Sequence, residues 1–232
     1  MAIDFFLWPM LPPLIIPFIY CMKYKRGSLA EVLVITLVML LIVGLWPVYG
    51  SGTLGYSTGV YVATKALLFI VLPIVALTIL KRDKKSSIDL RQYGVKREGL
   101  RKSLWLCLVF LPIMLAANYI VWISTNPTFP SDFSNGTIMF FEASTEEFLF
   151  RGVLFILLLG LTDLKVAYST SFLCFVLMHQ QYYMHGLDIG LLVVLVQALL
   201  TIEIARRSGN IAGSWVLHGL NRYFTMAIFP LM

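Results

Sequence analysis

Eight apolar runs divide this chain of 232 residues, and short polar segments separate them. Most of the runs approach the roughly 20 residues that an α-helix needs to cross a bilayer. Hydrophobic residues make up 59% of the chain and charged residues only 13%. A soluble protein and a disordered chain are therefore both excluded, because neither carries so much apolar surface with so little charge. We predict an all-α, polytopic membrane protein with about eight transmembrane helices, at 5–22, 29–48, 60–80, 103–123, 137–159, 166–184, 187–205 and 211–231.

The first run differs from the others because it is interrupted by four prolines, Pro9, Pro12, Pro13 and Pro17. Proline breaks or kinks a helix, so this run is predicted to be kinked or only partly inserted. The chain starts without a basic region and without a small-residue cleavage site, so we do not expect a removable signal peptide. The three cysteines, Cys21, Cys107 and Cys174, each fall in an apolar run and are predicted to be buried free thiols.

The basic residues are arranged on alternate connections between the runs. The segment 81–102 holds nine of the 18 Lys and Arg residues, and most of the others follow the first, fifth and seventh runs. The connections 50–59, 124–136 and 185–186 contain none. Because cytoplasmic loops carry the excess of Lys and Arg, this pattern predicts that both termini are extracytoplasmic. The net charge of +6 is then explained by basic residues that bind the anionic leaflet of the lipid bilayer. We expect no nucleic-acid partner.

The fifth run contains ionisable residues that a membrane helix normally avoids. Each charge near the bilayer centre costs at least about 2.5 kcal/mol, so these side chains must face protein or a wet cavity. Glu147 and Arg151 lie four residues apart and can pair, whereas Glu146 points about 100° away from Glu147. We therefore predict one carboxylate neutralised by Arg151 and another facing a cavity. Glu142 is predicted to be hydrated near the outer end, and Lys65 of the third run to extend its amine to the membrane surface.

Two histidines also fall inside apolar runs, His179 in the sixth and His218 in the eighth. Asn221 and Arg222 follow His218 on the same side of its helix. Three chemistries fit such a set. A buried carboxylate and a histidine can activate water while a second histidine and an amide bind an oxyanion. Glu and His can instead hold zinc, although no HExxH sequence is present, or relay protons in a transporter. A purely structural polar network is a further alternative.

Three motifs in this part of the chain resemble those of one protein family. Glu146-Glu147-Phe-Leu-Phe-Arg151 resembles the EExxxR motif of the CPBP family, which includes the CAAX prenyl proteases of the Rce1 type and the bacteriocin-processing, or Abi, proteins. Phe175-Val-Leu-Met-His179 resembles its FxxxH motif, and the stretch from Arg207 to Asn221 resembles its last motif, in which a His precedes an Asn. The resemblance covers roughly residues 137–225.

The resemblance implies an intramembrane endopeptidase that cleaves a membrane-associated peptide or protein, in CAAX-type or bacteriocin and signal-peptide-type processing. The apolar runs and the charge pattern predict that residues 1–136 form four N-terminal transmembrane helices with the basic cytoplasmic segment 81–102, and the resemblance implies that 137–232 form the catalytic core. No cofactor is expected to be required, with zinc as the alternative. The implied catalytic residues are Glu146 as the base, His179 as its assistant, and His218 and Asn221 as oxyanion donors; Glu147, Arg151 and Arg222 would support the site.

One position departs from the family pattern. The family usually places the Asn four residues after the His, and here that position is Arg222, with Asn221 at three. Either Asn221 reaches the site from the adjacent direction, or Arg222 replaces it as a cationic donor. The same fold could also serve a non-catalytic membrane interaction, or a bacteriocin-immunity or regulatory protein, and this is the main alternative function. A proton-coupled transporter is a weaker alternative, because the chain has no internal repeat.

Overall fold

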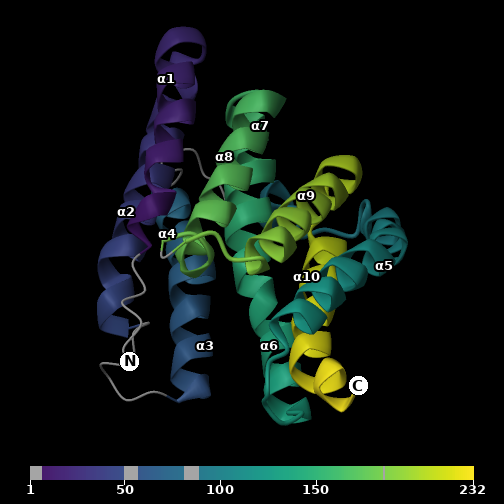
Figure 1. Ribbon diagram of the computed structural model, residues 1–232. Coiled ribbons are helices and arrows are strands. Elements are labelled where there is room, and N and C mark those ends of the chain that lie inside the picture. The colour runs from purple at the N-terminus through teal and green to yellow at the C-terminus, as the bar shows by residue number, and fades with distance from the viewer. Residues whose placement is uncertain (1–6, 50–56, 81–88, 185) are drawn as a thin grey trace.

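The computed structural model of the protein describes residues 7–49, 57–80, 89–184 and 186–232, and the regular elements in these ranges are helices. Parts of the predicted polar connections 50–59, 81–102 and 185–186 fall outside the described residues. The predicted all-α class is confirmed. Figure 1 shows α1 to α4 packed along one side of the bundle, with α5, α9 and α10 along the other and α6, α7 and α8 between them.

The N-terminal part begins with the segment in which prolines were predicted to interrupt a helix. Two short 3₁₀ turns, Trp8–Met10 and Pro12–Leu14, precede helix α1, which covers only Ile15–Tyr24. Ten residues rise about 15 Å, half of a bilayer core, so α1 alone is too short to cross a membrane. The next elements are α2 (Leu29–Tyr49), α3 (Thr58–Ala66) and α4 (Leu72–Leu80), with a π-helical turn at Leu67–Val71 joining the last two.

The α-helices of the C-terminal part range from four to 26 residues. Its elements are α5 (Leu100–Thr125), α6 (Phe133–Glu147), α7 (Leu158–Leu161), α8 (Leu164–Met178), α9 (Gly190–Ser208) and α10 (Ala212–Tyr223). A π-helical segment, Phe148–Leu157, joins α6 to α7, so the predicted fifth run is a continuous helical rod.

Three helical stretches within the described residues are long and apolar enough to cross a membrane: Arg26–Pro47, Thr58–Leu80 and Leu100–Thr125. Helix α5 presents large apolar side chains on its outer surface, among them Trp105, Leu108, Ile113 and Ile123. Side chains of this kind are stable outside a protein core when lipid surrounds them. The chain is thus an integral, multi-pass membrane protein, while the full number of eight spans stays a prediction.

Two hydrogen bonds join described parts of the basic connections in pairs. The amine of Lys25, after α1, donates to the carbonyl of Thr162, after α7, over 2.6 Å. The amide of Asn210, after α9, donates to the carbonyl of Lys96, before α5, also over 2.6 Å. In Figure 1 these ends lie toward the top of the bundle, whereas the C-terminus lies at the bottom. The side that faces the cytoplasm stays a prediction.

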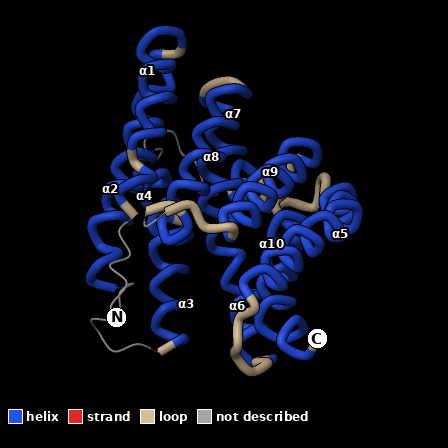
Figure 2. The backbone as a smooth tube through the Cα atoms, viewed as in Figure 1, coloured by secondary structure: helices blue, strands red, loops and turns tan. Residues whose placement is uncertain are grey.

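Helix α8 is shorter than the predicted run 166–184. It ends at Met178, where His179 leaves helical geometry with φ −88° and ψ 49°. A 3₁₀ turn at Gln180–Tyr182 follows, and the Tyr183 hydroxyl donates to the carbonyl of Leu177 over 2.6 Å. The prediction of a continuous span to 184 was wrong because these polar groups satisfy the helix end locally. The loop between α8 and α9 consequently crosses the bundle partway along its length (Figure 2).

Helix α10 packs closely against α5 and α6 because two of its residues are glycines. A Cβ at Gly213 would lie 2.1 Å from the carbonyl oxygen of Ser103 in α5, and a Cβ at Gly219 would lie 2.7 Å from that of Phe140 in α6. The backbone amide of Gly213 also donates to the hydroxyl of Ser103 over 2.8 Å. Small residues of this kind let membrane helices approach closely. This packing brings the polar side chains of α10 against α6.

Candidate functional site

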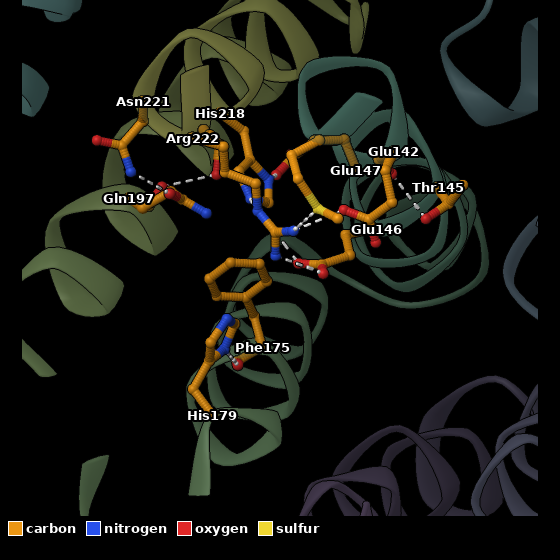
Figure 3. A network of polar contacts seen from close by, with 12 residues as sticks. Glu142, Thr145, Glu146, Glu147, Phe175, His179, Gln197, His218, Asn221 and Arg222 are labelled. Atoms are coloured by element: carbon orange, nitrogen blue, oxygen red, sulfur yellow. Dashed lines mark hydrogen bonds and ion pairs between the residues drawn. The ribbon is translucent and has the colours of Figure 1, made fainter. Parts of the chain in front are cut away.

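The ionisable side chains of the apolar runs converge on one buried cluster (Figure 3). Its members come from α3, α6, the π-helical segment after α6, the end of α8 and α10; they are Lys65, Glu142, Glu146, Glu147, Arg151, His179, His218 and Arg222. The side chains of Glu142, Glu146, Glu147, Arg151 and His218 are all at most 1% exposed. Burial of so many charges is tolerated only when they neutralise one another.

Glu142 and Glu146 form one half of the cluster, on one face of α6. The amine of Lys65 binds Oε1 of both carboxylates. The guanidinium of Arg222 also bridges them, with Nη1 2.6 Å from Glu142 Oε2 and Nη2 3.0 Å from Glu146 Oε1. Two carboxylates are therefore balanced by two cations, one from each side of the helix.

Glu147 forms the other half, on the adjacent face. Its Oε2 lies 3.4 Å from Nε of Arg151, so the predicted pairing of these two residues is confirmed. The Arg151 Nε also donates to the Thr201 hydroxyl over 2.8 Å, and its guanidinium carbon lies 4.4 Å from the centroid of the Phe175 ring. This ion pair therefore contacts both α8, through Phe175, and α9, through Thr201.

His218 links the two halves. Its Nδ1 lies 2.8 Å from Oε1 of Glu147, and its Nε2 lies 3.1 Å from Nε of Arg222. A guanidinium can only donate, so Nε2 must accept; Nδ1 then carries the proton and donates it to Glu147. The ring is thus a neutral imidazole with both nitrogens engaged, and Nε2 lies 3.9 Å from Oε2 of Glu146.

A small cavity of about 70 Å³ lies beside Glu146 and His179, and Lys65, Arg222 and Gln181 are among its other polar lining residues. One water takes up about 30 Å³ in the liquid, so the cavity has room for about two. Oε2 of Glu146 has no hydrogen-bond partner within the described part of the chain. His179 is fixed by its Nδ1, which lies 2.8 Å from the carbonyl of Phe175, and this leaves its Nε2 for another partner.

A second, larger cavity of about 470 Å³ lies on the other side of Arg222. His179, His218, Asn221 and Arg222 line it, together with residues of α5 and α9. His179 and Arg222 line both cavities, whereas Glu146 lines only the smaller one among the described residues. Arg222 therefore stands between the Glu146 carboxylate and the larger cavity.

Asn221 is the predicted site residue that the structure does not bring to Glu146. Its Nδ2 donates to the side-chain carbonyl of Gln197 over 3.1 Å, and its Oδ1 accepts from the amide of Asn118 over 2.6 Å. Figure 3 shows it pointing away from the carboxylates, toward Gln197. The side chain one residue later, Arg222, takes the position beside the carboxylates.

Two predictions about charged residues were wrong. Lys65 does not extend to the membrane surface but is buried, with 3% of its surface exposed, and Glu142 is not hydrated but 0% exposed. Each is held by an opposite charge from another helix, which outweighs hydration near the membrane surface. A count of the charges in the apolar runs could have predicted a role for Lys65. The fifth run has three carboxylates, whereas Arg151 and Arg222 supply only two positive charges, so one more buried cation is needed.

The side chains do not fit a zinc site. Two cations, Lys65 and Arg222, already bind the oxygens of Glu142 and Glu146, and they would repel a zinc ion. Across the described ranges, no group of three or more His, Cys, Asp or Glu side chains is arranged to hold a metal. The carboxylates Glu142 and Glu146 are thus bound by cationic side chains.

Comparison with protein families gives a match to the C-terminal part of the chain. Residues 133–224 match the family described as Type II CAAX prenyl endopeptidase Rce1-like. No curated protein and no solved structure shows significant similarity to the chain. The matched range contains all three predicted motifs, with the ionisable residues of α6, α8 and α10 that form the cluster, and it leaves out Lys65. Residues 133–224 of this chain are therefore a domain of the Rce1-like CAAX prenyl endopeptidase family, the CPBP family that the motifs resemble.

Proposed function

We propose that this protein is an intramembrane endopeptidase that hydrolyses a peptide bond in a membrane-associated peptide or protein. The family of the 133–224 domain supports a CAAX-type protease. The observation that carries the mechanism is the small cavity shared by Glu146 and His179, which is large enough for water and lined by buried and half-buried side chains. A carboxylate and an imidazole beside an enclosed water are the groups that general-base hydrolysis requires.

In the proposed reaction, Glu146 takes a proton from a water that His179 orients through its Nε2. The water oxygen bonds to the carbonyl carbon of the substrate, and the carbonyl π electrons move onto the oxygen. Glu146 then gives the proton to the leaving nitrogen as the C–N bond breaks, so that a carboxylic acid and an amine are released. The buried contacts of Glu147 with Arg151 and His218 would fix the position of α10 relative to α6.

The larger cavity is the proposed substrate site. Its volume of about 470 Å³ falls within the usual range for ligand pockets, about 300–1,000 Å³. His179, His218 and Asn221 would contact the peptide there. The family name favours a prenylated CAAX peptide, and a bacteriocin or signal peptide is the other substrate class.

The experiment is peptide cleavage by purified protein in liposomes. Fluorogenic peptides, farnesylated at a C-terminal CAAX cysteine or unmodified, are supplied and the products are identified by mass spectrometry. Glu146→Gln and His179→Ala are each expected to lower kcat by about 100-fold or more, because each removes a group that moves or orients the attacking water. Full activity in Glu146→Gln would refute the mechanism.

Glu203→Gln is the matched control for this experiment. Glu203 is also a carboxylate on an apolar helix, but it pairs with Arg206 and Arg207 at the exposed end of α9. Its replacement is expected to leave cleavage unchanged. Loss of activity in this variant would mean that carboxylate removal acts through the stability of the protein.

One observation favours the alternative, a non-catalytic membrane interaction or immunity protein. Glu146 is bound by two cations, Lys65 and Arg222, which makes the resting carboxylate a weaker base than a free one would be. This alternative predicts that the wild-type protein cleaves none of the peptides and that Glu146→Gln keeps its biological effect.

A further inference from the structure

We propose that Arg222 is the residue that binds the oxyanion during hydrolysis, and that Lys65 is the fixed counter-ion that allows it to do so. In the resting site Arg222 neutralises Glu146; in the reaction its guanidinium turns to the carbonyl oxygen of the scissile bond in the larger cavity. This inference rests on the proposed peptidase function.

The position of Arg222 is the first support. Among the cations of the cluster it lines both the cavity beside Glu146 and the larger cavity, so its guanidinium stands where a carbonyl attacked by a water on Glu146 would lie. Its side chain is 24% exposed, whereas that of Lys65 is 4% exposed. Arg222 therefore has space to move, and Lys65 does not.

Three other polar side chains of the predicted site are already engaged. Nε2 of His218 accepts a hydrogen bond from Arg222 and has no proton to give. The amide of Asn221 donates to Gln197, on the far side from Glu146. Arg151 is held by Glu147 and Thr201. The N–H groups of Arg222 are the ones already directed at the reacting region.

Charge balance is the second support. At rest, Glu142 and Glu146 are balanced by Lys65 and Arg222, each carboxylate in contact with both cations. When Glu146 takes the proton from water it becomes neutral, and the negative charge moves to the carbonyl oxygen. The Arg222 guanidinium can then move from the carboxylates to the negatively charged carbonyl oxygen, because Lys65 still neutralises Glu142. Two neutral ion pairs exist before and after the step, which a low-dielectric site requires.

The atoms and electrons balance in this step. The water oxygen bonds to the carbonyl carbon, its proton passes to Glu146, and the π pair becomes the oxyanion that accepts from Arg222. When the oxyanion collapses, the C–N bond breaks and the nitrogen takes the proton from Glu146. The carboxylate is restored, and Arg222 returns to it.

The test compares Arg222 variants on the peptide that the wild-type protein cleaves in liposomes. Arg222→Ala is expected to lower kcat by about 100- to 1,000-fold, the usual effect of losing an oxyanion donor, with KM changed by less than about threefold. Added guanidinium ion is expected to restore part of the kcat, because it can occupy the vacated space. Arg222→Lys keeps the charge but loses the planar fork, so it is expected to recover only part of the activity.

A double variant separates catalysis from structure. Arg222→Ala alone leaves two buried carboxylates with one cation, which can impair folding, whereas Arg222→Ala with Glu142→Gln restores the balance. We expect this double variant to fold, as judged by its melting temperature, and to stay as slow as Arg222→Ala. Recovery of wild-type kcat in the double variant, or a loss carried by KM, would overturn the inference while leaving the peptidase function intact. Failure of the wild-type protein to cleave any peptide would overturn both.

Discussion

Among the described residues, each buried Lys, Arg or Glu side chain contacts an opposite charge from another position. Three carboxylates, Glu142, Glu146 and Glu147, meet three cations, Lys65, Arg151 and Arg222. Such a group is costly to break at one member, because removal of a partner leaves an uncompensated charge in a low-dielectric interior. The position of each charge is therefore coupled to all the others.

Lys65 offers the clearest test of this coupling. Replacement by Met fills a similar volume but leaves Glu142 and Glu146 with one cation, so Lys65→Met is expected to destabilise the protein by about 3–5 kcal/mol. The double variant with Glu142→Gln removes the surplus charge and is expected to regain most of that loss. Thermal unfolding in detergent measures both. Equal melting temperatures for Lys65→Met and the wild type would show that the Lys65 amine does not stabilise the protein by neutralising these carboxylates.

The helices are placed by close packing rather than by their apolar surfaces alone. Lipid tails are as apolar as leucine side chains. Apolar side chains therefore gain no hydrophobic free energy when they contact another helix in place of lipid. Helix α10 instead approaches α5 and α6 through Gly213 and Gly219, and a hydrogen bond from Gly213 to Ser103 fixes its position. The distance from His218 and Arg222 to the carboxylates of α6 depends on this approach.

Gly213→Ala is expected to push α10 away from α5, because the new methyl group would overlap the backbone of Ser103. The expected loss is about 1–3 kcal/mol, the usual cost of overpacking, together with reduced peptide cleavage. Gly44→Ala in α2 is the matched control, since nothing lies within 4 Å of a Cβ there. That control is expected to be neutral or slightly stabilising in an unfolding experiment. A Gly213→Ala protein as stable as the control would contradict the role given to this close approach.

As a whole, the molecule buries its polar cluster among the helices, while two described contacts between basic connections lie at helix ends. The Lys25 and Thr162 contact and the Asn210 and Lys96 contact each join two basic connections. The predicted orientation assigns these ends to the cytoplasm and the loop before α6 to the outside. The loop after α8, which follows His179 of the cluster, crosses the bundle partway along its length (Figure 2).

Cysteine labelling in intact cells tests this orientation. The three native cysteines are buried, so a membrane-impermeant maleimide is expected to leave them unmodified. Ser134→Cys, at the exposed start of α6, is expected to react from outside the cell. Glu98→Cys, exposed before α5, is expected to react only after the membrane is opened. The reverse pattern would invert the predicted topology.

Features that belong to one helix at a time could be predicted from the amino-acid sequence. Apolar run length predicted the helical class and the membrane, proline content predicted the broken first helix, and spacing of four predicted the Glu147 and Arg151 pair. The same spacing placed Glu146 on a separate face, and three motifs pointed to the family of residues 133–224. These features follow from local geometry, which repeats in every α-helix.

The pairing of charges on different helices, by contrast, depends on how the helices pack. Packing placed Lys65 of α3 against Glu142 and Glu146 of α6, put Arg222 rather than Asn221 beside the carboxylates, and ended α8 at His179. No spacing within one helix contains this information, because it requires the distance and the rotation between neighbouring helices. The candidate site thus extends beyond the matched domain, to a cation from the N-terminal half whose partners lie 77 and 81 residues away in sequence.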